Sequence, residues 1–310
     1  MNQPKSNPNP IFLRVNQDSS HAISFQRYGN KGMVNLYAID TNRNCNLTDE
    51  IKVSQNEDDD VLDAAFFPSA YGNVIAFGLA NGSIIFKKEH FDGESVQYQT
   101  IDVFFDENNS STNSELPKFD SNLRISIFPP ELNIGYISNG VIHIFFIDFG
   151  NIIKLIPIRR YRSNDPFIWF NFCDGYNHLM NSKESGTSVL SIWCATLDEL
   201  KKFYISSLDD EKKYHKKVLN KKIVDASISP VKINNDERIA VLMDDGNVDI
   251  YTGTMQETPV ATINSHVKSP VSVEWSPFGS RIAVCSGASS PRCFIESTNN
   301  VWTEIESPTE

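Results

Sequence analysis

The residue types that most often carry catalysis or bind metals form no recognisable site in this sequence. None of the six histidines has the spacing of a metal-binding HxxxH or HExxH pair. The chain also lacks the G-x-S-x-G turn that exposes a nucleophilic serine and the glycine-rich loop that binds phosphate. We therefore expect a protein that is not an enzyme and that uses no cofactor, no metal and no small-molecule substrate.

Three features come nearest to a chemical site. His143 falls inside the strand-like run Val141–Ile147, where a packed histidine is far more common than a metal ligand. The acidic run at 58–60 lacks the glycine and the distal glutamate of a calcium loop. The five cysteines form no CxxC pair, which indicates free thiols in a reducing compartment; they stand at positions 45, 173, 194, 285 and 293.

The elements that would position such residues repeat along the chain. A turn glycine followed by an alternating strand recurs about every 50 residues or twice that interval, at Gly32, Gly82, Gly140 and Gly246. A second series, in which an apolar strand ends at proline, keeps the same phase at Pro68, Pro129, Pro230 and Pro277. Units of this length hold four short antiparallel strands, which is the size of one propeller blade. An irregular β-sandwich gives no reason for a fixed period and is the less favoured alternative.

We therefore expect an all-β chain folded as a six-bladed β-propeller. Residues 1–10 contain three prolines and are expected to be disordered, and one propeller domain is expected over residues 11–310. The blades are expected at about 11–54, 61–105, 122–158, 167–219, 223–264 and 271–306.

Several connections are also predicted. A strand at Glu50–Val53 is expected to end blade one, and the polar stretch 106–120 and the basic cluster 159–162 are expected to be loops. The hairpin at Thr196–Leu200 lacks a turn glycine, and no fourth strand is assigned to blade four. The lysine cluster at 212–222 follows acidic residues and is expected to form a mixed-charge surface.

Strand counting bears on how the propeller closes. In most propellers an N-terminal strand completes the last blade, so that no sheet edge is left weak. Here the first strand begins at Ile11 and blade six carries a fourth strand around Trp302, so we expect an open seam between blades one and six. The residues expected to contact a partner's strands in this seam are Ile11, Leu13, Val15, Val271, Val273, Trp275 and Phe294.

Charge and hydropathy restrict the partners. The formal net charge of −11 argues against nucleic-acid binding, which needs a basic face. No apolar run reaches about 18 residues, so no direct membrane insertion is expected. No signal peptide is recognisable, and a cytoplasmic location is expected.

Two tracts resemble a known family. The tract 67–87, above all Tyr71–Ala76, resembles the second blade of the small coat-scaffold WD-repeat propellers, and Val271–Val284 with the closing Asn300–Trp302 resembles their last blade. These are the Sec-type propeller of the COPII outer cage and the Seh-type propeller of the nuclear pore's Y-shaped complex. The sequence departs from the family in that no Trp-Asp pair ends any third strand.

The resemblance implies an open, WD-repeat-like propeller that receives a seventh blade from a partner. That partner would be a coat or nucleoporin scaffold protein with an α-solenoid. The implied function is that of a structural scaffold subunit in vesicle-mediated protein transport or in the nuclear pore complex. The implied location is at endoplasmic-reticulum exit sites and COPII vesicles, at the nuclear envelope, or at both. The alternative is a generic WD-repeat adaptor that presents peptides or substrates to a larger complex. A propeller hydrolase or lyase, which would need converging carboxylates or histidines in the central channel, is the least favoured alternative.

Overall fold

The structure is a computed structural model of the 310-residue chain. It describes residues 12–16, 20–28, 31–40, 45–53, 61–79, 83–91, 93, 96–105, 125–128, 133–138, 140–149, 153–175, 189–205, 214–232, 236–276, 278–286, 291–298 and 300–305. The expected disordered start at 1–10, the acidic run at 58–60 and the loop at 106–120 lie outside these residues. The chain divides into two compact units, Met1–Tyr161 and Arg162–Glu310.

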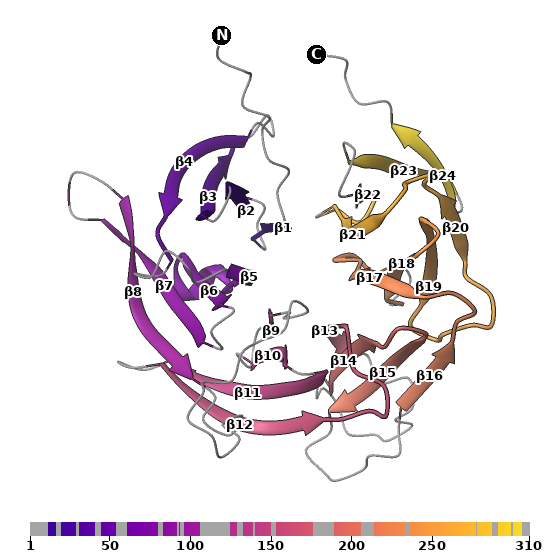
Figure 1. The fold of residues 1–310 in the computed structure, drawn as a ribbon, viewed down its shortest axis with the longest axis horizontal. Coiled ribbons are helices and arrows are strands. Elements are labelled where there is room, and N and C mark those ends of the chain that lie inside the picture. The colour runs from indigo at the N-terminus through magenta and orange to yellow at the C-terminus, as the bar shows by residue number, and fades with distance from the viewer. Residues whose placement is uncertain are drawn as a thin grey trace. The chain divides into compact units, whose positions relative to one another are not determined.

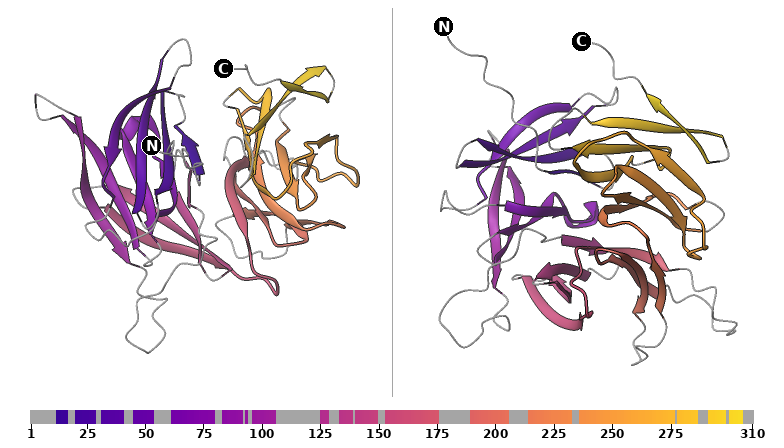
Figure 2. Two further views of the ribbon diagram at one scale, coloured as in Figure 1. Left: turned by 45° about the horizontal axis from the view of Figure 1, so that its top comes forward. Right: turned by 45° about the vertical axis from the view of Figure 1, so that its right-hand side comes forward.

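The first unit contains three four-stranded antiparallel sheets (Figures 1 and 2). The sheet of blade one consists of β1 (Phe12–Val15), β2 (His21–Tyr28), β3 (Lys31–Ile39) and β4 (Cys45–Ile51). Blade two consists of β5 (Val61–Phe66), β6 (Val74–Leu79), β7 (Ser83–Phe91) and β8 (Val96–Phe105). Blade three consists of β9 (Ile125–Phe128), β10 (Asn133–Ser138), β11 (Val141–Phe149) and β12 (Ile153–Tyr161).

The second unit contains three further sheets of the same kind. Blade four consists of β13 (Trp169–Gly175), β14 (Val189–Ala195), β15 (Glu199–Ile205) and β16 (Tyr214–Val218). Blade five consists of β17 (Ile223–Ile228), β18 (Arg238–Met243), β19 (Asn247–Thr252) and β20 (Ala261–Asn264). Blade six consists of β21 (Pro270–Trp275), β22 (Arg281–Ser286), β23 (Arg292–Thr298) and β24 (Val301–Ile305).

The fold is a six-bladed β-propeller, as the sequence predicts. Every sheet joins four strands that follow one another in the chain, which is the meander of a propeller blade. Blade six is built from the last four strands and blade one from the first four, so each terminal blade is completed by its own end of the chain. The strand count inferred from the sequence is therefore confirmed for these two blades.

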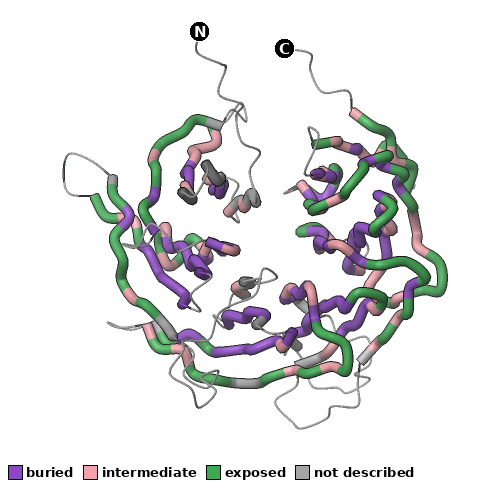
Figure 3. The backbone as a smooth tube through the Cα atoms, viewed as in Figure 1, coloured by how far each residue is buried: buried purple, intermediate pink, exposed green. Residues whose placement is uncertain are grey.

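Neighbouring blades within a unit pack face to face through apolar side chains. In the first unit, Phe77 of β6 belongs to the core that blade two shares with blade one, and Ala76 belongs to the core shared with blade three. In the second unit, Val241 of β18 belongs to the core that blade five shares with blade four, and Leu242 belongs to the core shared with blade six. Successive residues of a strand point to opposite faces, so a middle strand with neighbours on both sides is buried at every position and is mostly apolar. All six residues of β6 and of β18 are accordingly buried (Figure 3).

The only helix in the described part of the chain is a single 3₁₀ turn, Ser69–Tyr71, after Pro68. No helix among these residues is long and apolar enough to cross a membrane.

Three sequence-based expectations about the strands are wrong: the loop at 159–162, the lack of a fourth strand in blade four, and the bounds of the last strand of blade one. Arg159, Arg160 and Tyr161 are not in a loop, because they end β12 and pair with β11. Blade four has a fourth strand, β16, in the middle of the lysine cluster. Lysine is tolerated on this outer strand because its charged end reaches solvent or a carboxylate, as the salt bridge of Lys216 to Glu199 shows.

The last strand of blade one also differs from the prediction. It spans Cys45–Ile51 and ends where the predicted strand, Glu50–Val53, begins. A β-bulge between Leu36 and Tyr37 shifts its register against β3, and a bulge of this kind is not visible in an alternating pattern. Lys212 and Lys213 of the lysine cluster lie outside the described residues.

The turn between β14 and β15 forms without glycine. The backbone N–H of Glu199 donates a hydrogen bond to the Thr196 hydroxyl at 3.2 Å, and Thr196 N donates to Glu199 O at 2.9 Å. The Thr196 hydroxyl lies 3.4 Å from a carboxylate oxygen of Asp198. A threonine side chain thus replaces the glycine of the other hairpins by binding the backbone of its own turn.

The hairpin between β18 and β19 does require glycine. Gly246 has a φ of +85°, in the region that residues with a Cβ avoid, and a Cβ at this position would lie 2.4 Å from the carbonyl oxygen of Val267. The Ser265 hydroxyl donates a hydrogen bond to Gly246 O at 2.5 Å, which fixes the chain beyond β20 against this turn.

We predict that Gly246→Ala lowers the free energy of unfolding by about 2–4 kcal/mol, because it adds a steric clash to an unfavourable φ. Gly93→Ala is the matched control: Gly93 also has a positive φ, +98°, but nothing lies within 4 Å of its added Cβ. The control is expected to lose only about 1 kcal/mol. Urea denaturation followed by circular dichroism measures both, and equal losses in the two variants would refute the clash with Val267.

Candidate partner-binding face of blade six

The residues that the sequence assigned to the seam come from both compact units. The two halves of this set belong to different units, Leu13 and Val15 to the first and the blade-six residues to the second. Ile11 lies outside the described residues. In the register of β1 and β2, Leu13 is opposite Ser24 and Val15 is opposite Ala22. The partner-contact role of Leu13 and Val15 remains a prediction.

In blade six, the predicted set needs correction. Val273, Trp275 and Phe294 are almost fully buried in the core that blade six shares with blade five. The Trp275 indole N–H donates to Ser227 O at 3.0 Å, which ties it to β17. These three side chains therefore pack against blade five and are not available to contact an added blade. Val271, at 46% exposure, lies on the surface.

The reason for the correction is the two-residue periodicity of the strand. A sequence shows which residues are apolar, but not which face of a sheet meets which neighbour. Val273 pairs with Val284 in the register of β21 and β22, so the two share a face, and both pack on blade five. A partner of blade six would instead meet the residues that alternate with them.

We define the distal face of blade six as the side of this sheet that points away from blade five. It carries the residues that alternate with the core positions of β22 and β23, together with the cross-strand neighbour of Cys293 in β24: Arg281, Ala283, Cys285, Cys293, Ile295 and Ile305. In the described part of the chain none of the six belongs to a hydrophobic core cluster. Arg281 is exposed, and the other five are only partly buried.

Comparison of β18 with β22 shows what is different about this face. Both strands begin with Arg-Ile-Ala-Val, but β18 continues with Leu-Met and is buried throughout, whereas β22 continues with Cys-Ser and alternates between buried and partly exposed residues. Blade six thus has one face that is buried against blade five and one face, with small residues on β22, that is incompletely covered.

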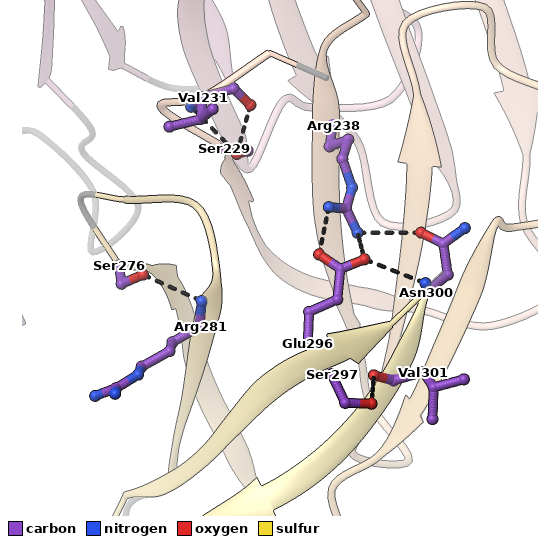
Figure 4. Close-up of polar contacts among 9 residues, drawn as sticks. All are labelled: Ser229, Val231, Arg238, Ser276, Arg281, Glu296, Ser297, Asn300 and Val301. Atoms are coloured by element: carbon purple, nitrogen blue, oxygen red, sulfur yellow. Dashed lines mark hydrogen bonds and ion pairs between the residues drawn. The ribbon is translucent and has the colours of Figure 1, made fainter. Parts of the chain in front are cut away.

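A polar cluster fixes blade six against blade five at one end of the shared core (Figure 4). The guanidinium of Arg238 in β18 donates to both carboxylate oxygens of Glu296 in β23, at 2.8 and 3.2 Å, and to the side-chain oxygen of Asn300 at 3.3 Å. Its central carbon lies 5.2 Å from the ring centre of Trp275 and 5.7 Å from that of Trp302. Only 4% of the Arg238 side chain is exposed, so this two-pronged ion pair is removed from water and framed by aromatic rings.

The two thiols of the distal face are not activated for chemistry. Burial raises the pKa of both the Cys285 and the Cys293 thiol. A hydrogen bond with Ser272 opposes this for Cys285, and the charge of Arg281 opposes it for Cys293. Both therefore stay protonated near neutral pH and act as small, weakly polar contact residues.

Other predicted features lie elsewhere. His143 is 3% exposed, and its ring stacks on Tyr136 with centroids 4.9 Å apart. Cys194 is fully buried in blade four. Among the described residues no group of three or more histidine, cysteine or acidic side chains is placed to hold a metal ion.

The distal face was not predicted, although the sequence contains a signal for it. The even positions of β22, Ile282 and Val284, are large, whereas the odd positions, Ala283 and Cys285, are small. In β18 the corresponding alternate position after the shared motif is Leu242. Comparison of blades position by position, rather than by overall apolar content, would have identified the incompletely covered side.

Comparison with known proteins supports the fold and goes no further. No family model matches the sequence. No curated protein matches it either. Among solved structures, the chain is similar to a protein from Bacteroides fragilis provisionally described as a 6-phosphogluconolactonase, with a TM-score of 0.61 and 15% identity over 96% of this chain and 83% of that one. Because 948 chains of solved structures match, the likeness shows a common fold, and a fold by itself does not determine an activity.

This likeness corrects one expectation. The absence of catalytic motifs led us to expect that the chain is not an enzyme, and that exclusion is wrong. The solved structure that shares the fold is itself described as an enzyme. A propeller of this kind is therefore compatible with catalysis even when its sequence contains no recognisable catalytic motif.

We predict that Arg238→Met lowers the free energy of unfolding by about 2–4 kcal/mol, because it leaves the Glu296 carboxylate without its buried partner. Lys221→Met is the control, since the salt bridge of Lys221 to Asp245 is 48% and 38% exposed at its two side chains. This control is expected to lose about 0–1 kcal/mol. Urea denaturation followed by tryptophan fluorescence compares them, and similar losses would show that the framed ion pair contributes no more than a surface pair.

We predict that iodoacetamide alkylates Cys285 and Cys293 slowly at pH 7, with rates that rise about tenfold per pH unit up to pH 9. The raised thiol pKa leaves a small thiolate fraction throughout this range. Mass spectrometry of the peptides that contain each cysteine measures the rates. A rate that levels off below pH 8 would mean that the thiols have a lowered pKa and a reactive role.

Proposed function

We propose that this chain is a scaffold propeller that binds β-strands of a partner chain on the distal face of blade six. The observation that carries the proposal is the contrast between β18, buried on both faces, and β22, which begins with the same four residues but is incompletely covered on one face. A sheet face with Ala283, Cys285, Cys293 and Ile295 gains burial only if another layer packs on it.

The completeness of blade six supports this proposal. Its four strands come from one end of the chain, so no strand from the other end is needed within the sheet. An additional element therefore packs on blade six as a separate layer, through side chains, and does not replace a missing strand. A partner that donates several strands as one blade fits this geometry better than a single extended peptide.

The identity of the partner rests on the sequence resemblance described above. That resemblance supports a coat or nucleoporin scaffold protein whose α-solenoid is joined to the donated strands, in the COPII outer cage or the Y-shaped complex. The corresponding location is at endoplasmic-reticulum exit sites or the nuclear envelope. The net charge of −11 supports a protein partner and disfavours nucleic acid.

We predict that affinity purification of the tagged chain at low salt yields a stoichiometric partner, and that Ile295→Asp reduces its recovery at least about tenfold, because a carboxylate would be buried in the contact. Val218→Asp makes a similar apolar-to-acidic change at a residue of blade four that is 61% exposed, and this control should leave recovery unchanged. Thermal unfolding of both variants checks that they remain folded.

A partner that contains an α-solenoid and protects Cys285 and Cys293 from alkylation would support the coat or pore assignment. Recovery of the chain alone, or equal recovery with Ile295→Asp, would overturn the proposed contact and favour the adaptor alternative.

A further inference from the structure

Blades five and six carry the same motif at the same place in the sheet. Arg-Ile-Ala-Val begins β18 at Arg238 and β22 at Arg281. The carbonyl of each arginine accepts a hydrogen bond from the serine that precedes a proline, Ser229 N at 2.8 Å in blade five and Ser276 N at 2.9 Å in blade six. The two arginines therefore occupy equivalent positions in successive blades.

In blade five, this position faces the following blade. Ala240 and Leu242, which alternate with Ile239 and Val241, pack on blade six. Arg238 lies on the same side of β18 and reaches Glu296 in the third strand of blade six, as described above. The motif thus places a guanidinium where it binds a carboxylate of the next blade.

In blade six, the same position faces outward. Ile282 and Val284 pack on blade five, so Arg281 and Ala283 lie on the distal face. Arg281 is exposed. Among the residues that the structure describes, its guanidinium makes no ion pair or hydrogen bond, and Figure 4 shows it extending away from the residues drawn, while its backbone N–H bonds to Ser276.

Among the described residues of blade one, the position equivalent to Glu296 carries no carboxylate. Glu296 N donates to Ser280 O at 3.1 Å, just before Arg281, and the equivalent bond in blade one runs from Ile39 N to Ser20 O at 2.8 Å. Blade one therefore has isoleucine where blade six has its carboxylate. By the same comparison, Val15 stands where blade six has Trp275, and the nearest acidic residue, Asp40, comes one position after β3 ends.

We propose that Arg281 determines which strands bind the distal face: it selects a partner blade that carries a carboxylate at the end of its third strand. This inference rests on the proposed function and specifies the chemistry of the partner. The occupant is a β-blade of another protein, with an acidic residue in the place of Glu296 and small or apolar residues over Cys293 and Ile295. Charge complementarity at one end of the face sets the register of the contact, and the apolar residues supply the burial.

The chain itself supplies a probe for this site. A backbone-cyclised peptide with the sequence of residues 291–306 reproduces the β23–β24 hairpin, including the Glu296 carboxylate that binds Arg238. Serine replaces Cys293 in the peptide to prevent disulfide exchange. Three versions carry Glu, Gln or Lys at position 296, and their affinities for the full-length protein are measured by fluorescence anisotropy. Protection of Cys285 from alkylation reports whether the peptide lies on the distal face.

We expect the Glu peptide to bind about tenfold more tightly than the Lys peptide, with the Gln peptide between them. Arg281→Glu should reverse this order. Lys268→Glu changes the net charge by the same amount at an exposed residue that is not part of the distal face, and should leave the order unchanged. A reversal confined to Arg281→Glu would separate a local contact from general repulsion by the acidic protein.

Two results would overturn the inference in distinguishable ways. If all three peptides protect Cys285 with equal affinity, the distal face binds strands but Arg281 does not select them, and the proposed function stands. If no peptide protects Cys285 at millimolar concentration, the distal face does not accept a β-layer, and both the inference and the proposed contact fail.

Discussion

The structure depends on one constraint: each β-sheet must bury its apolar side chains against a neighbouring sheet. β6 and β18 show the result where a blade has neighbours on both sides, since every residue of these strands is buried. A fully buried large apolar side chain contributes roughly 1.5–3 kcal/mol, so such strands stabilise their unit strongly. The same constraint is not met for a blade at the end of a unit, because no sheet of that unit buries its second face.

Polar groups fix the orientation that apolar packing leaves free. Apolar contact alone tolerates sliding of one sheet over another, whereas a two-pronged ion pair is satisfied in one position. The pair of Arg238 with Glu296 costs desolvation, which the Asn300 contact and the rings of Trp275 and Trp302 partly offset. We interpret this cluster as an alignment device between blades five and six that adds specificity to the contact.

The sequence was sufficient for the fold because turns and strand periodicity are local properties. Gly246 follows from a turn that needs positive φ, and the prolines after the first strands mark the phase of the repeat. The site was predicted less well. Apolar character identified Val273, Trp275 and Phe294, but which neighbour a face meets is a tertiary property, and these residues proved to face blade five. β16 was missed because lysine-rich outer strands resemble loops in composition.

The residue types on the distal face indicate a specific binding surface and not merely the end of the repeat. A terminal sheet face built from large apolar residues would associate with any exposed sheet, and proteins avoid this with small or charged side chains. Blade six has Cys285 where blade five has Leu242, and it keeps an arginine at the position that, one blade earlier, holds the blades together. An exposed charge disfavours apolar surfaces in general and favours those that carry its counter-charge. Arg281 can therefore both disfavour non-specific association of the exposed face and select the partner that binds it.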